Sequence, residues 1–114
     1  MKFKFEKGVR IVCDLISHCY HAGALDYHID MRIRKDISVY HISAPVPKMT
    51  EEDAARLRET LNTPRQREVE QNYWGLSGEP ETGSELVLAG MMVDEAIVDL
   101  TDGVLTIIAK RLEE

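Results

Sequence analysis

Long apolar runs, surplus basic charge and cysteine are all scarce in this sequence, and each shortage excludes a class of protein. No stretch approaches the roughly 20 apolar residues that a membrane-spanning helix needs. The opening segment MKFKFEKG lacks the apolar core of a signal peptide. The chain carries 14 basic residues against 20 acidic ones, a net charge of −6, so no broad basic surface for nucleic acid is expected. We therefore expect a cytoplasmic protein that binds neither nucleic acid nor a membrane.

Only two cysteines occur, Cys13 and Cys19, and they lie six residues apart in one predicted helix. At about 100° per residue this spacing turns roughly 600° around the helix axis, so the two side chains lie on different faces and do not form a disulfide. Both are expected to be reduced, buried thiols.

The chain does have enough apolar residues for one folded core. Its 114 residues are 44% hydrophobic and 30% charged, which is typical of a single domain spanning residues 1–114. Phe3 and Phe5 alternate with lysines and predict a short edge strand. Residues 6–25 predict a helix that stops near Gly23. Apolar residues at helical spacing mark its buried face: Val9, Val12, Ile16, Cys19 and Tyr20, with Leu15 beside them.

Two hairpins and two further helices follow. The segment YHIDMRIRKDISVYHIS alternates apolar and charged residues, which predicts a hairpin that turns at Lys35-Asp36 and has one wet face. A second hairpin is predicted around Asp102-Gly103. Residues 50–61 predict an amphipathic helix with a capping box formed by Thr50 and Asp53 and a buried face of Ala54, Leu57 and Leu61.

Between that helix and the second hairpin lies a polar segment, residues 62–84, and then a helix that is apolar nearly all round from Leu86 to Val93. Helices and strands in this order predict an α+β fold. Its architecture is a two-layer α/β sandwich with the helices on one face of a mixed, mostly antiparallel sheet.

The order of elements resembles the ATP-binding domain of the histidine kinase, gyrase and anti-sigma-factor kinase superfamily (GHKL), over about residues 9–112. In the segment DLISHCYHAGA, Asp14 stands at the family's general base and His18 stands where the family has a magnesium-binding asparagine. The segment TEED matches the helix start that follows the family's adenine-binding turn. The segment ETGSELVLAG resembles its glycine-rich phosphate segment.

The residues that would hold a nucleotide depart from the family pattern. The turn SAPVPKM has neither the aspartate that binds the adenine amine nor the glycines that allow close approach. In the phosphate segment only Gly83 remains, and Glu85 would repel a phosphate. A histidine at position 18 also removes an oxygen ligand that magnesium prefers. The residues that the resemblance places around the former pocket are Asp14, His18, Ala44, Val46, Lys48, Gly83 and Glu85.

These departures predict a non-catalytic binding or regulatory module with a degenerate histidine-kinase-ATPase-like fold, in bacterial signalling and without a cofactor. The alternative is a protein that binds a nucleotide or another small ligand and keeps ATPase or kinase activity through Asp14.

Other residues suggest weaker alternatives. His18 and His21 lie at i, i+3 and would form a metal site with Cys13, His28 or His41, but no recognised metal-ligand spacing supports one, and no metal is expected. Cys19 beside these histidines is not expected to be a nucleophile, because adjacent residues on a helix point apart.

Partner contacts are expected at two places. Tyr73 and Trp74 either anchor an unknown protein partner or pin the polar segment to the body of the domain. Met91 and Met92 lie on the apolar helix, whose second face would form a homodimer contact.

Overall fold

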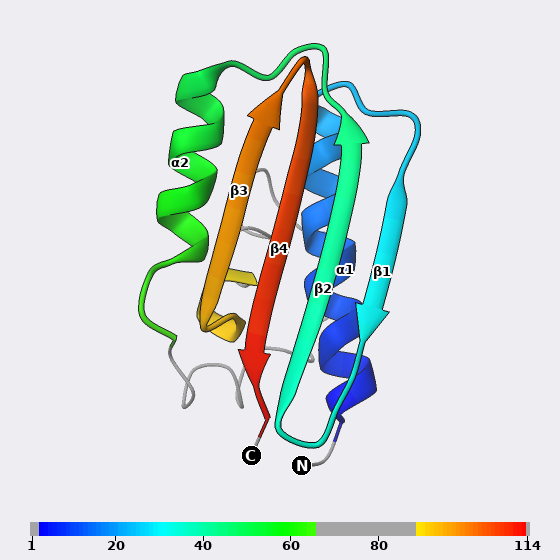
Figure 1. The fold of residues 1–114 in the computed structure, drawn as a ribbon, viewed down its shortest axis with the longest axis vertical. Coiled ribbons are helices and arrows are strands. Elements are labelled where there is room, and N and C mark those ends of the chain that lie inside the picture. Colours follow the sequence, from blue (N-terminus) through cyan, green and yellow to red (C-terminus); the bar gives the residue numbers. More distant parts are fainter. Residues whose placement is uncertain (1–2, 66–88, 114) are drawn as a thin grey trace.

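The computed structural model describes residues 3–65 and 89–113. The described helices are α1 (Lys4–His21) and α2 (Glu51–Leu61). The strands are β1 (His28–Arg32), β2 (Ile37–Pro45), β3 (Glu95–Thr101) and β4 (Val104–Leu112). Residues 89–92 are also helical. The strands form one sheet in the order β1-β2-β4-β3, with α1 behind it and α2 beside β3 (Figure 1).

This arrangement confirms the predicted two-layer α+β fold. Every strand pair among the described residues is antiparallel, so the prediction of a mixed sheet is wrong. The additional strand expected at the first residues of the chain is not formed either. Lys4 and Phe5 belong to α1 instead, and Phe3 is its N-cap, in the left-handed conformation at φ 64°.

The buried side of α1 differs from the predicted face. Its stripe consists of Gly8, Ile11, Val12, Leu15 and Cys19, at helical spacing. Val9 and Tyr20 are exposed. Cys13 also lies on the exposed side, which corrects the expectation that both thiols are buried. The helix stop near Gly23 is confirmed, because α1 ends at His21.

The core fills the space between the inner face of the sheet and the helices. Alternate residues of β2 and β4 face each other there, with Tyr40 opposite Ala109, Ile42 opposite Ile107 and Ala44 opposite Leu105. The helices contribute Ile11 and Leu15 from α1 and Ala54, Leu57 and Leu61 from α2. The buried face predicted for α2 is therefore confirmed.

Local signals in the sequence placed the helix start and the second turn correctly. Thr50 and Asp53 form the capping box, in which each side chain accepts a hydrogen bond from the backbone N–H of the other residue. Asp102 and Gly103 connect β3 to β4 with φ values of 53° and 75°. Positive φ at both central residues is the requirement of a type I′ hairpin turn, and asparagine, aspartate and glycine tolerate it best.

The predicted helix at 84–93 is only partly described. Its start lies outside the described residues, and the helical part at 89–92 buries Ala89 and Met92 in the core. Within the described ranges no helix has the length and apolar character needed to span a membrane.

Candidate functional site

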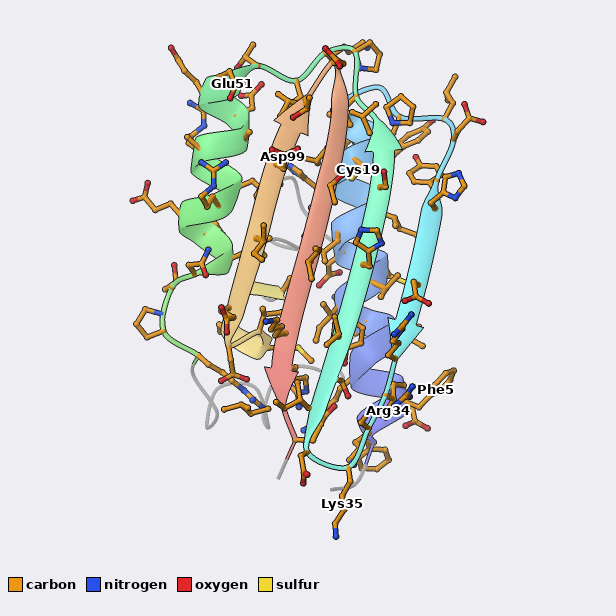
Figure 2. The ribbon with its side chains drawn as sticks, viewed as in Figure 1. Phe5, Cys19, Arg34, Lys35, Glu51 and Asp99 are labelled. Carbon is orange, nitrogen blue, oxygen red and sulfur yellow. The ribbon has the colours of Figure 1, made fainter. Side chains whose placement is uncertain are left out.

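A cavity of about 400 Å³ lies between the C-terminal turn of α1 and the face of α2 that runs from Asp53 to Thr60. Cys19 and Glu51, both labelled in Figure 2, mark the two helix ends that flank this region. The lining residues come from α1, from the turn after β2 and from α2: His18, His21, Ala22, Lys48, Met49, Asp53, Arg56, Leu57 and Thr60.

The turn after β2 is fixed on both sides by backbone hydrogen bonds. The N–H of Val46 donates to the carbonyl of Gly103 at 2.8 Å, and the N–H of Lys48 donates to the carbonyl of Ala22 at 3.1 Å. Pro47 packs against Gly23, since a Cβ atom built there would lie 3.2 Å from its Cγ. This tie between the turn and the end of α1 holds Lys48 and Met49 at the cavity.

The prolines and the valine of the turn are therefore structural. Ala44 and Val46 are buried in the core and do not line the cavity. Ala44 lies on the inner face of β2, and Val46 is bonded through its backbone to Gly103, so neither side chain contributes to this cavity.

Charged groups of both signs face the cavity. Lys48 and Arg56 are exposed cations, and Arg56 forms an ion pair with Asp53. The carboxylate of Asp53 also accepts the backbone N–H of Thr50 at 3.0 Å. The bonds from Thr50, and then the charge of Arg56, lower the pKa of Asp53. Asp53 thus stays ionised, and its charge is engaged by the helix cap and the ion pair.

Three of the other lining residues are apolar, and His18, His21 and Thr60 add polar groups beside them. Ala22 and Met49 are half-buried and Leu57 is buried. An apolar wall with a few cationic or hydrogen-bonding groups at its rim is the usual lining of a small-molecule site. Carboxylates and phosphates are the groups that lysine and arginine bind most strongly. The cavity is therefore suited to an organic anion with an apolar body.

Asp14 does not reach this cavity. It is buried one turn before His18, and its Oδ1 lies 3.4 Å from Nε of Arg10. Of the described residues expected around the former pocket, His18 and Lys48 line this cavity together. Gly83 and Glu85 lie outside the described residues.

Several lining residues were not assigned to this site from the sequence, namely Asp53, Arg56, Leu57 and Thr60, and His21 was considered only as a metal ligand. Two spacings carried a usable signal, because His18 and His21 on one helix and Asp53 and Arg56 on the other each stand at i, i+3. Nothing local indicated that these two helix faces meet.

The structure also bears on the metal site and on the cysteine nucleophile, the two alternatives weighed from the sequence. Across residues 3–65 and 89–113, no three histidine, cysteine, aspartate or glutamate side chains are placed to hold a metal ion. Cys19 is buried, and burial raises the pKa of its thiol to about 11, which disfavours a thiolate nucleophile.

The residues expected to contact a protein partner have different outcomes. Tyr73 and Trp74 lie outside the described residues. Met92 is fully buried in the core, so its assignment to a homodimer surface is wrong. Met91 is half-buried and packs against the same core.

No protein-family model matches the chain, and no curated protein matches it.

Proposed function

We propose that this protein is a non-catalytic binding module that takes a small organic anion in the cavity between α1 and α2. One observation carries the proposal: the cavity combines the exposed cations Lys48 and Arg56 with an apolar wall that includes Met49 and Leu57. The cations would hold a phosphate or carboxylate group, and the wall would cover the organic part of the ligand.

We also propose that the fold is that of the histidine kinase-type ATPases. Two features support this assignment. The described helices and hairpins come in the order that the resemblance leads us to expect, and the cavity contains His18 and Lys48, which the resemblance places at the nucleotide. An adenine nucleotide is accordingly the first ligand to test. A regulatory role in bacterial signalling, a cytoplasmic location and an unidentified protein partner remain proposals that rest on the sequence.

The acidic groups near the cavity do not favour turnover. Asp14 is buried beside Arg10 and does not line the cavity. Asp53 does line it, but its carboxylate is engaged by Thr50 and Arg56 and its pKa is lowered, so it is a poor general base. Among the described residues, this leaves the cavity without an acidic group poised to activate water.

Calorimetric titration of the purified protein with ATP, ADP and inorganic phosphate, with and without magnesium, tests the proposal. We expect saturable binding of at least one nucleotide. Because a charge-assisted hydrogen bond contributes about 1.5–3 kcal/mol, Lys48→Ala and Arg56→Ala should each weaken binding roughly ten- to a hundredfold. Lys110→Ala, which removes an exposed cation from β4, should leave binding unchanged.

Two results would contradict this account. Absence of heat with all three ligands at millimolar concentration would remove the anion site. Release of phosphate from ATP that is lost in Asp14→Ala would favour the alternative of a residual ATPase.

A further inference from the structure

The two edge strands of the sheet, β3 and β1, have different surroundings. On the β3 edge, the amide of Asn62 donates to the carbonyl of Ala96 at 2.9 Å and accepts the N–H of Ala96 at 3.0 Å. Arg58 donates to the carbonyl of Val98 at 2.6 Å. These side chains from α2 and the residue after it occupy backbone groups that another strand would use, and they close this edge to pairing.

The β1 edge lies at the opposite side of the sheet, with nothing beyond it among the described elements (Figure 1). Four of its five residues are exposed. An exposed edge strand presents unpaired backbone groups and is a template for another strand unless it is blocked.

The sequence of β1 is complementary to itself. When two antiparallel copies are centred on Met31, Asp30 of each strand lies opposite Arg32 of the other. Ile29 then lies opposite Ile33. The side chains of Asp30 and Arg32 are 53% and 65% exposed and already contact each other within the chain at 2.9 Å, so both lie on the outer face. Opposite charges directly across a strand pair are stabilising, whereas like charges are not.

We propose that β1 pairs with β1 of a second copy, antiparallel and centred on Met31, and joins two four-stranded sheets into one. Paired residues in this register share a face, so both helix layers lie on the same side of the joined sheet. Phe5, which is 61% exposed, lies beside the same edge and adds apolar surface at the junction (Figure 2). A short strand pair is a small interface, so the dimer is weak and depends on concentration.

Charge exchange across the dimer axis tests this register. Asp30→Arg places two arginines opposite each other at both charge pairs of the dimer, and Arg32→Asp places two aspartates there, so each variant alone has two like-charge pairs. Sedimentation velocity up to millimolar protein should show a wild-type dimer, with self-association weakened about tenfold or more in each variant. In an equimolar mixture, a dimer of one Asp30→Arg chain and one Arg32→Asp chain pairs an arginine with an aspartate at both positions, so the mixture should dimerise better than either variant alone.

The double exchange Asp30→Arg with Arg32→Asp in one chain restores an opposite charge at both pairs and should dimerise like the wild type. The double exchange also restores the ion pair between residues 30 and 32 within one chain. Circular dichroism and the thermal midpoint of each variant therefore show whether a loss of dimer comes from strand pairing or from a less stable fold. Lys110→Asp, on the outer face of β4 and two strands away from this edge, should leave dimerisation unchanged.

Three results would overturn the proposal. The first is a wild-type protein that stays monomeric at millimolar concentration. The second is a pair of single variants that dimerise as well as the wild type. The third is a folded double exchange that fails to associate, because its charges match those of the wild type in the proposed register.

Discussion

The two cysteines differ in their surroundings although they belong to one helix. Cys13 is exposed, whereas Cys19 lies in the core and its pKa is raised to about 11 by burial. Thiol reagents attack the thiolate, and they need access to it. We therefore expect one thiol per chain to react with Ellman's reagent in the native protein and two after unfolding. Cys13→Ser should abolish the native reaction, and equal reaction rates of both thiols in the wild type would contradict the structure.

Asp53 makes the stability of the first turn of α2 depend on pH. Bonds from Thr50 and the charge of Arg56 lower its pKa in the folded state. A lowered folded-state pKa adds stability above the unfolded value of about 3.9, and this contribution is lost as the pH falls through the folded pKa.

The thermal midpoint of Asp53→Asn should therefore lie below that of the wild type at neutral pH, and the difference should shrink as the solution is acidified towards the folded pKa. Glu52→Gln, at an exposed position in the same turn, is the matched control and should show a smaller difference. A gap between wild type and Asp53→Asn that stays constant across this range would contradict the assigned role.

For single residues, the sequence predicted an interaction correctly where the two interacting residues are close in the chain. The capping box could be recognised because Thr50 and Asp53 are three residues apart. The role of Val46 could not, since its backbone partner is Gly103, in the second hairpin. A turn rich in proline and valine looked like an altered ligand loop, although its valine belongs to the core.

Among the elements, the packing of α1 on the sheet depends on one close approach. A Cβ atom at Gly8 would lie 2.6 Å from Cε of Met31 and 2.9 Å from Oη of Tyr40. The end of a methionine side chain can move, but Tyr40 is held in the core. Gly8 therefore sets the distance between the helix and the first hairpin.

Gly8→Ala should destabilise the protein by about 1–3 kcal/mol through overpacking, although alanine is the better helix former by roughly 1 kcal/mol. Urea denaturation measures this change. Ser17→Ala, at a half-buried position of the same helix, should cost little or raise stability. A Gly8→Ala variant as stable as the wild type would show that the helix and hairpin are less tightly apposed than described.

For helices and strands, α1 and β4 show what could not be predicted from the sequence. Alternating Phe3 and Phe5 satisfied a strand pattern, but α1 begins at Lys4 and both phenylalanine side chains are exposed. The segment AKRLEE gave no sign that Arg111 is fully buried. It lies on the inner face of β4, where Glu113 and the carbonyl of Met92 are its partners, at 3.2 and 2.8 Å. The two charges are two residues apart, but the groups that satisfy them, the carbonyl of Met92 and the hydroxyl of Ser38, come from distant parts of the chain.

For the molecule as a whole, patterning predicted the fold class and both hairpins, because these follow from alternation and turn residues. It did not predict how the faces and edges of the sheet are used. One edge is closed by Asn62 and Arg58, the other carries the self-complementary β1, and the cavity forms where two helix ends meet. The closed edge and the cavity join residues far apart in the chain, and the position of β1 at an edge depends on the order of all four strands.

The central claim is that the cavity between α1 and α2 binds a small organic anion. Amide NMR spectra of the labelled protein, recorded while ADP is added, test it most directly. The account predicts saturable shifts concentrated at the cavity residues His21, Lys48, Met49 and Arg56, with His41 and Lys110 on the outer face of the sheet unchanged. Shifts that cluster elsewhere, or spectra that do not change at millimolar ADP and phosphate, would contradict it.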